Sequence, residues 1–511
     1  MAITVSYPGV YVQELDSGVR VIPGVPTSIT AFVGRARRGP TDTPIRVQGL
    51  GEFGRRFGEL WSEAPMGYSV THFFVNGGSD AVIVRVHSLS GADDLARADV
   101  PADGGTPMTL TAANPGIWGN QLRATITHPD AGDAFHLTIQ EVSPSNPLQV
   151  VAEERFLNLT LTAGDARFVT DVLLAQSQLS RVETLPSGRP QLTLGVPIPF
   201  EDGDDGLPID AGQVSDSNLA TPRHGIYALE NADLFNLLCI PPFAPGISPE
   251  IDTWDAAAAY CLTRRAMLLV DPDPAWEPAT WVGPDAVIAG VDALITRSPN
   301  SAIYFPRIRV PDPLKENRLE TFAPSGAVAG VIARIDAQRG VWKAPAGQDA
   351  TLNGVPELTV RLTDGEQGQL NPIGVNCLRT RPIAGRVVWG ARTTRGADQL
   401  ADQWAYLPVR RTALFIEESL FRGTQWVVFE PNDEGLWSQI RLNVGAFMNG
   451  LFRRGAFQGT TPAQAYFVKC DRESNPQEDI DRGIVNIIVG FAPLKPAEFV
   501  LLSIQQIRPT V

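Results

Sequence analysis

Short continuous apolar runs alternate with helical patterns before residue 90 and again after residue 237. The runs predict buried strands, and the helical patterns predict the helices that cover them. In chain order the predicted strands are 28–34, 81–86, 237–242, 266–270 and 302–305, and the predicted helices are 65–75, 256–265, 284–296 and one that Ser325 caps after Pro324. This alternation predicts an α/β body with a parallel or mixed sheet.

Residues 91–210 have a different texture. They are dense in Gly, Pro and Thr, and apolar and polar residues alternate at 122–127 and 135–139. Such alternation is typical of short antiparallel strands, so we predict an inserted β-rich domain. The segment holds 17 acidic residues and six arginines with no lysine, a net charge of −11. A charge of this size favours a position on the solvent-facing surface.

The last part of the chain predicts a mixed helix and strand domain. A helix opens at Asn432 or Asp433 and carries one apolar stripe. The stripe consists of Leu436, Ile440, Val444, Phe447 and Leu451. Strands are predicted at 425–429, 465–470 and 484–491.

Each end of the chain carries an apolar segment rich in β-branched and aromatic residues and bounded by Pro or Gly, the pattern of a strand. Terminal residues fray unless something holds them, so these strands are candidates for addition to the sheet edge of a neighbouring subunit. Pairing within their own domain is the alternative. The arm residues are Ile3, Val5, Tyr7, Val10, Tyr11, Val12, Phe499, Val500, Leu501, Leu502 and Ile504.

The predicted fold is therefore a multidomain combination of α/β and α+β parts. An α/β body with a mixed sheet carries the β-rich insertion, and a C-terminal α+β domain is completed by exchanged strand arms. The expected boundaries are 1–20 for the N-terminal arm, 21–90 and 211–350 for the body, 91–210 for the insertion, 351–496 for the C-terminal domain and 497–511 for the C-terminal arm. Stretches 15–27 and 492–497 are the expected hinges of the arms.

Composition narrows the function classes. The 511 residues carry a net charge of −14 and no dense basic stripe, so we expect no nucleic-acid partner. No run of 18 apolar residues is present, and the first residues lack the basic and apolar regions of a signal peptide. We therefore expect a protein of the cytoplasm without direct membrane insertion. The four cysteines are scattered, which favours a reducing compartment.

One basic stretch stands out in this acidic chain. Residues 437–470 contain Arg441, Arg453, Arg454 and Lys469 and no acidic residue. We expect the three arginines to contact an acidic partner. The alternative is that they pair with Glu417, Glu418 or Glu478 of this protein instead of contacting a partner.

None of the candidate catalytic or ligand-binding motifs is complete. Residues 49–54 match G-x-G-x-x-G, but we expect neither a good strand before them nor a helix after them, and a phosphate site needs both. The acidic turn 202–206 lacks the distal glutamate of a calcium loop. A predicted strand is followed by Asp271-Pro272-Asp273-Pro274, at the strand end where α/β enzymes often bind ligands. The alternative interpretation is a loop stiffened by its two prolines. We predict no catalytic, cofactor or metal residue. An α/β enzyme with a ligand site at the 237–310 sheet remains an alternative.

Four blocks of sequence resemble the contractile phage tail sheath family. The blocks are 8–14 with 23–34, then 324–331 with 339–346, then 415–420 with 426–437, and finally 470–499 with its Asn475, Gly483 and Ala492-Pro493-Leu494-Lys495-Pro496-Ala497. The resemblance is weakest across 91–210, although 114–120 is similar to a motif of larger members.

The resemblance implies a non-enzymatic subunit that forms stacked six-subunit rings around an inner tube and contracts to drive the tube through a target envelope. It also implies partners in the tube, the baseplate and a terminal cap, and assembly into a phage tail or phage-tail-like particle in the bacterial or host-cell cytoplasm. In family members the arms of neighbouring subunits complete a shared sheet, and the 351–496 domain faces the tube. A static shell protein with interlocking arms is the remaining alternative.

Overall fold

The structure is a computed structural model that describes residues 20–129, 132–294, 296–499 and 501. It divides into two compact units. The body unit comprises residues 28–338 and 345–407, and the terminal unit comprises residues up to 27, 339–344 and those from 408 onward. Each is described separately.

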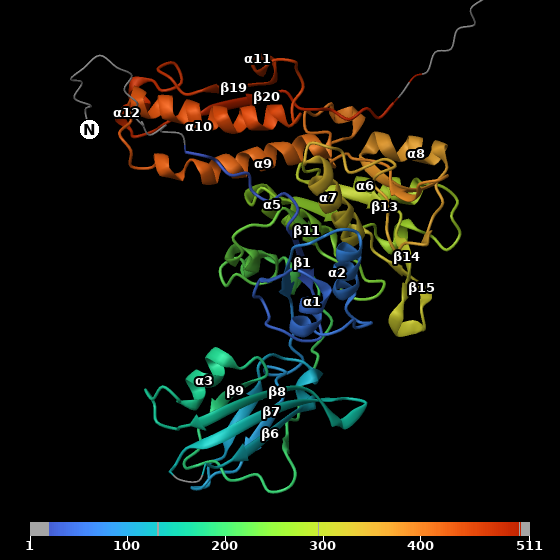
Figure 1. Cartoon of the computed structure of the whole chain (residues 1–511). Helices are drawn as coiled ribbons and strands as arrows, with labels where there is room; N and C mark the ends of the chain where they lie inside the picture. Colours follow the sequence, from blue (N-terminus) through green and yellow to red (C-terminus); the bar gives the residue numbers. More distant parts are fainter. Residues whose placement is uncertain (1–19, 130–131, 295, 500, 502–511) are drawn as a thin grey trace, which may run out of the picture. The chain divides into compact units, whose positions relative to one another are not determined.

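An eight-stranded mixed sheet forms the centre of the body unit (Figure 1). Its spatial order is β18 (Gly385–Val388), β17 (Val375–Arg381), β13 (Ser301–Phe305), β12 (Met267–Val270), β11 (Leu237–Cys239), β1 (Thr30–Gly34), β3 (Ala81–Arg85) and β2 (Ile45–Val47). The pairings from β17 to β3 are parallel, and both edge strands are antiparallel. The central strands are buried throughout, as continuous apolar runs require.

Four of the following seven helices of the body lie where the sequence predicts them, near 65–75, 256–265, 284–296 and after Pro324, and the other three were not predicted. The seven helices are α1 (Leu50–Phe57), α2 (Pro65–Val75), α4 (Ala211–Val214), α5 (Ile251–Thr263), α6 (Asp285–Ala293), α7 (Ser325–Arg339) and α8 (Asp364–Leu370). A small sheet of β15 (Arg318–Phe322), β14 (Ile308–Asp312) and β16 (Glu357–Leu358) lies beside them in the same unit. The predicted mixed sheet is confirmed.

The start of α7 differs from the expectation. Ser325 does not cap the helix, because it is the first helical residue. Its backbone N–H and its hydroxyl both donate to the carboxylate of Asp271, at 2.8 and 2.7 Å. A residue at the end of β12 therefore supplies the acceptor that the helix N-terminus needs.

The insertion has a core of its own. A four-stranded sheet and a three-stranded sheet contribute side chains to one apolar cluster. The elements are β10 (Ile198–Pro199), β6 (Leu122–Thr127), β7 (Phe135–Ser143) and β8 (Asn146–Leu159) in one sheet, β4 (Arg97–Val100), β5 (Met108–Ala112) and β9 (Ser180–Thr184) in the other, and helix α3 (Val169–Gln176). Buried positions alternate with less buried ones along β6, as the sequence predicts.

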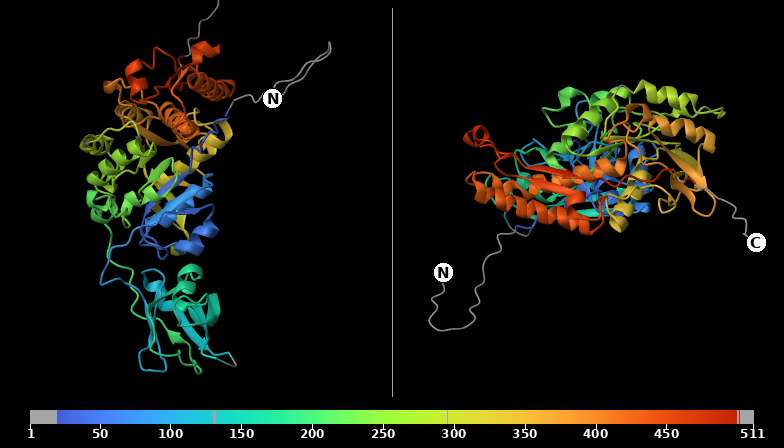
Figure 2. Two further views of the ribbon diagram at one scale, coloured as in Figure 1. Left: turned by 90° about the vertical axis from the view of Figure 1, so that its left-hand side faces the viewer. Right: turned by 90° about the horizontal axis from the view of Figure 1, so that it is seen from above.

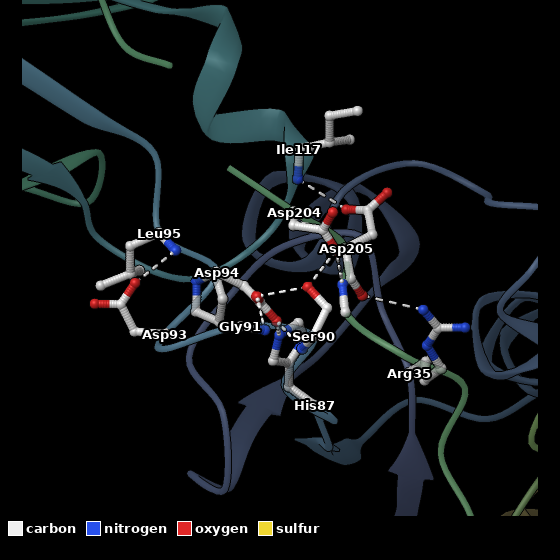
Figure 3. A network of polar contacts seen from close by, with 12 residues as sticks. Arg35, His87, Ser90, Gly91, Asp93, Asp94, Leu95, Ile117, Asp204 and Asp205 are labelled. Carbon is white, nitrogen blue, oxygen red and sulfur yellow. Dashed lines mark hydrogen bonds and ion pairs between the residues drawn. The ribbon is translucent and has the colours of Figure 1, made fainter. Parts of the chain in front are cut away.

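Two chain connections join the insertion to the rest of the body unit, as Figure 2 shows. A polar network ties them together (Figure 3). The buried Asp94 carboxylate contacts His87 Nε2 at 2.9 Å and accepts from the Ser90 N–H at 2.8 Å. From the returning connection, the Asp205 carbonyl accepts from Arg35 at 3.1 Å. The joint is therefore fixed by several bonds rather than being a loose tether.

A buried arginine adds to this joint. The Arg85 guanidinium donates to the carbonyls of Ala36, Gly39 and Pro115, at 2.9, 2.7 and 2.8 Å. Pro115 belongs to the insertion, so this side chain connects the insertion to the body sheet. Burial lowers the pKa of Arg85 to about 10, which leaves it charged at neutral pH.

The joint predicts a response to acid. Burial lowers the pKa of His87, with Arg85 and Arg35 acting in the same direction and Asp94 opposing them. A folded-state pKa below the unfolded value of about 6.5 means that stability is lost as the pH falls below that value. We expect the temperature of the first unfolding transition in calorimetry to decrease when the pH is lowered from 7 to 5. The decrease should be smaller in His87→Gln. An equal decrease in both proteins would contradict this role of His87.

The terminal unit contains two long helices and one small sheet. Its elements are α9 (Leu407–Gly423), α10 (Glu434–Arg453), α11 (Pro462–Ala465), α12 (Gln477–Asp481), β19 (Tyr466–Lys469) and β20 (Ile488–Phe491). The expected strand at 425–429 is wrong. Residues Gln425–Val427 form a 3₁₀ turn, and Phe429 has a φ of 72° that ends any extended run. The segment connects two helices, so its β-branched residues have no neighbouring strand among the described residues.

The boundary between the units also differs from the expected one at residue 351. Residues 345–407 group with the body, because β17 pairs with β13 and thereby adds β17 and β18 to the body sheet. Helix α9 was not predicted at all. Its apolar residues are interrupted by Arg410, Arg411, Glu417 and Glu418, which obscure the helical period.

The G-x-G-x-x-G segment is flanked by the two elements that we did not expect. Strand β2 precedes it, and α1 begins inside it at Leu50, with Gly49 as the residue before the helix. β2 is formed by pairing with β3, and α1 buries Phe53 and Phe57. The first turn of α1 already holds a carboxylate. Glu52 accepts from the Gln48 N–H at 3.0 Å, and this hydrogen bond is the main cause that keeps the pKa of Glu52 low. A phosphate would meet this negative charge.

Candidate assembly site of the terminal unit

Helix α10 organises the terminal unit. Asp433 caps it by accepting from the Leu436 N–H at 2.9 Å, which confirms the predicted start. All five residues of the predicted stripe are buried in the core of the unit. Partly buried residues of β19 and β20 pack against the same core, so the amphipathic helix covers the small sheet.

The sheet of the terminal unit has two strands. β19 and β20 are antiparallel, with Tyr466 opposite Phe491 and Lys469 opposite Ile488. Among the described residues each strand has a single strand partner, so its other side offers backbone donors and acceptors along an open edge. Such an edge is able to accept an added strand.

Most of the expected arm residues lie outside the described residues. These are Ile3, Val5, Tyr7, Val10, Tyr11, Val12, Val500, Leu502 and Ile504. Phe499 and Leu501 are described, and their exposed fractions are 77% and 94%. Apolar side chains this exposed gain little from the fold of their own subunit.

Residues 20–27, which we call the linker, pack on α9 and α10. Ile22 belongs to the core of the unit and lies against Gly423, where a Cβ atom would approach Ile22 Cγ2 to 2.4 Å. The Val25 N–H donates to Ser419 Oγ at 3.2 Å, and Arg411 donates to the Thr27 carbonyl at 2.8 Å. The linker is thus held along its length, and the expected hinge at 15–27 is wrong for these residues.

The first described residue is held as well. The Arg20 N–H donates to Asn443 Oδ1 at 2.9 Å, and the Arg20 guanidinium lies 4.5 Å from the centre of the Trp426 ring. Sequence reasoning missed Arg20, Trp426 and Asn443. No local pattern could have found this contact, because Arg20 and Asn443 are 423 positions apart.

The second expected hinge, 492–497, is restrained at its start. The Ala492 N–H donates to the Ala465 carbonyl at 2.8 Å, and the Gln458 N–H donates to the Ala492 carbonyl at 2.9 Å. Pro493 forms an isolated bridge with Phe457. The structure gives residues 494–497 no regular element.

The three arginines of the candidate tube contact have different surroundings. Arg441 pairs with Glu434 at 2.7 Å and also donates to the Cys470 carbonyl. Arg453 and Arg454 are exposed at the end of α10, and Arg454 lies 5.5 Å from the Trp342 ring centre.

Two of the three acidic residues expected as their internal partners are engaged elsewhere. Glu417 pairs with Arg410 at 3.2 Å, and Glu418 pairs with Arg422 at 2.7 Å. Lys469, the remaining cation of the basic stretch, pairs with Glu473.

The alternative site at the body sheet is occupied by the protein's own groups. Burial raises the pKa of Asp271 to about 7, against the opposing hydrogen bonds from Ser325. Both of its oxygens already hold the start of α7, and Asp273 accepts from the Ala275 N–H at 2.7 Å. The described residues contain no grouping of His, Cys, Asp and Glu that could hold a metal ion, and their four cysteines are buried free thiols. No helix among the described residues is long and apolar enough to cross a membrane.

Comparisons with known proteins agree on one family. Residues 302–394 match the model of the phage tail sheath protein central domain, and residues 400–507 match that of the phage tail sheath C-terminal domain. A tail sheath protein of Burkholderia phage BcepMu is 23% identical over 505 residues, which cover 96% of this chain and 94% of that protein.

Solved structures show the same fold. The sheath complex of the extracellular contractile injection system PVC, in its contracted state, matches with a TM-score of 0.59 and 21% identity, and 99% of each chain is covered. The contracted helical sheath of the anti-feeding prophage matches with a TM-score of 0.58 and 22% identity, covering 98% of this chain and 100% of the other. With the two adjoining family models and the full-length relative, these matches confirm the resemblance to the contractile phage tail sheath family that was found in the sequence.

Proposed function

We propose that the chain is the repeating subunit of a contractile sheath, which polymerises as stacked six-subunit rings around an inner tube. The observation that carries this proposal is the open two-stranded sheet β19–β20, located in the same unit as the first and last described residues. Arms of neighbouring subunits would add to its free edges. The names of the related solved structures, a sheath complex and a helical sheath, support the same role.

Strand addition explains how the assembly would survive a large rearrangement. Each added strand forms several backbone hydrogen bonds, with a net value of about 0.5–1.5 kcal/mol each. Two arms per subunit would keep the subunits linked while the body units rotate. If the contracted lattice buries more surface than the extended one, contraction releases stored free energy and needs no nucleotide.

Movement of the arms then requires hinges outside the restrained residues. The linker 20–27 and residues 492–493 are held by the contacts described above. We place the hinges before residue 20 and within 494–497.

The sheath must also release the tube when it contracts. Arg453 and Arg454, exposed at the end of α10, are the cations that we assign to an acidic tube surface. Arg441 has partners in its own unit and is assigned a structural role. The baseplate and a terminal cap would bind the two ends of the sheath. We assign assembly to the cytoplasm of the producing cell and no enzymatic step to the chain.

Electron microscopy of the purified protein tests this proposal. We expect negative-stain images to show tubes of variable length built from stacked rings. A small soluble species at all concentrations would contradict the proposal. Closed shells instead of tubes would favour the static alternative.

We further propose that the insertion faces outward and is separable from assembly. It has its own apolar core, and its net charge would keep neighbouring particles apart. Replacing residues 91–210 by a short Gly-Ser bridge should permit ring stacking but lower solubility. The body should lose about 1–3 kcal/mol, because Arg85 loses the Pro115 carbonyl and Arg38 loses Glu141.

The measurement combines denaturant unfolding with microscopy of the shortened protein. Loss of ring stacking in a shortened protein that is still folded would contradict the proposal. Arg38→Ala in the full-length chain is the control for the lost ion pair.

A further inference from the structure

The connection between α9 and α10 displays an aromatic side chain on a strained main chain. Phe429 has a φ of 72°, in the left-handed region that is unfavourable for a bulky residue. Its exposed fraction is 102%, so its own subunit leaves it uncovered, and Val428 beside it is 57% exposed. We call these two residues the knob. A strained main chain that holds an aromatic ring in solvent points to a role outside the subunit.

The outer face of the sheet β19–β20 also carries uncovered apolar side chains. Every second residue of each strand packs on the core of the unit, so Phe467, Lys469 and Ile488 share the other face. Phe467 and Ile488, which we call the patch, are 56% and 47% exposed. The Phe467 ring lies over the main chain of β20, because a Cβ atom at Gly490 would approach its Cε1 to 2.2 Å. The patch is therefore a fixed apolar surface.

The charges beside the knob and the patch have opposite signs. Glu430 directly follows the knob and is exposed. Lys469 lies beside the patch and pairs in its own subunit with Glu473, whose side chain is 81% exposed. A surface pair of this kind is weak, so Lys469 can exchange its partner. An apolar knob flanked by an acid is thus complementary to an apolar patch flanked by a base.

We propose that the knob of one subunit docks on the patch of a second copy of this chain, with Glu430 approaching Lys469. Docking removes the Phe429 ring from water, which offsets the strain of its main chain. Because the two surfaces differ, each copy engages one neighbour with its knob and another neighbour with its patch. Such a head-to-tail contact repeats into a ring or a helical tube. The inference rests on the proposed function, because it requires a repeating assembly of copies.

Photo-cross-linking identifies what residue 429 contacts. The photoreactive substitution Phe429→benzoylphenylalanine keeps an aromatic knob on the full-length chain. After irradiation of concentrated protein we expect covalent dimers, with the link located by mass spectrometry within residues 466–469 or 488–491 of the second copy. The same substitution at Ile383 is the matched control, because Ile383 is also fully exposed at a φ of 72°. It should give no link to these residues.

Substitution measures how much the contact contributes to assembly. Phe429→Ser should raise the protein concentration needed for assembly about tenfold or more, the effect of losing one buried aromatic side chain per contact. Its unfolding temperature should match that of the wild type, because the ring is uncovered in the subunit. Ile383→Ser should assemble at the wild-type concentration. Glu430→Lys should weaken assembly about two- to fivefold, and adding Lys469→Glu should restore part of this loss.

Links from residue 429 to another segment, or only within one chain, would overturn the proposal. Equal assembly concentrations for Phe429→Ser and the wild type would overturn it as well. Wild-type tubes without the expected link would refute this contact and leave the sheath assignment standing. Linked dimers without tubes would refute the sheath assignment alone, and the absence of both would refute both.

Discussion

Deleting residues 2–14, or residues 498–511, should abolish tube formation and leave the body unit folded. Neither deletion touches the linker, which stays packed on α9 and α10, or the contacts at Ala492. The described residues of the body unit form a core and a sheet of their own. What is lost is the strand that each subunit would add to its neighbour, and with it several hydrogen bonds per contact.

The measurement combines thermal unfolding with negative-stain microscopy. We expect unfolding temperatures close to that of the wild type and no detectable tubes. A milder version replaces Phe499 and Leu501 by Ser. Their exposed side chains contribute little to the isolated subunit, so assembly should weaken without a change in stability.

Val282→Ser is the matched control for the point variants, because Val282 is an exposed apolar residue of the body. It should assemble normally. Normal-length tubes from either deletion variant would show that the arms do not link subunits, and melting of the body would show that they support the fold instead.

Reversing the charge of both Arg453 and Arg454 to Glu should leave empty sheaths intact and prevent tube-filled extended particles. Exposed ion pairs are worth about 0–1 kcal/mol each, so one contact is weak enough to release during contraction. Two such residues in each of many subunits would still hold an extended sheath on its tube. Charge reversal converts every one of these attractions into a repulsion of similar size.

The test is to count extended, tube-filled particles after co-expression with the tube and baseplate proteins. Arg441→Glu is the informative comparison. It breaks the contacts with Glu434 and Cys470 and should lower the stability of the terminal unit more than the double variant does, because the double variant loses only the contact of Arg454 with the Trp342 ring. If the double variant forms tube-filled extended particles at the wild-type frequency, these arginines do not contact the tube. A high salt concentration should mimic the double variant, because it screens exposed charges.

Much of the fold follows from local sequence. The capping aspartate and the apolar stripe of α10 lie within twenty residues of one another, and they specify a helix and its buried face without help from elsewhere. The central parallel strands are equally predictable from local sequence, because continuous apolar runs such as Met267–Val270 are suited only to burial on both faces. The family resemblance, too, was carried by short blocks of sequence.

Local patterns failed where a distant partner decides the outcome. Residues 425–429 have the composition of a strand, but no strand lies beside them among the described residues, and they became a turn between helices. Strand β2 has too few residues to be predicted and exists because β3 offers it an edge. The candidate site shows the same division, since the stripe of α10 was predicted whereas the surroundings of its three arginines were not.

The sequence by itself determined five of the eight strands of the body sheet, the separate texture of the insertion, the central helix of the terminal unit and the family resemblance. The tertiary structure decided that Asp271 holds the start of α7, that Arg85 and Asp94 fix the insertion, that β17 and β18 belong to the body, and that the linker runs over Asn443. The reason is physical. Periodicity and capping act over a few residues, whereas a buried polar group takes whichever partner the packed chain places beside it, and that partner can be hundreds of residues away.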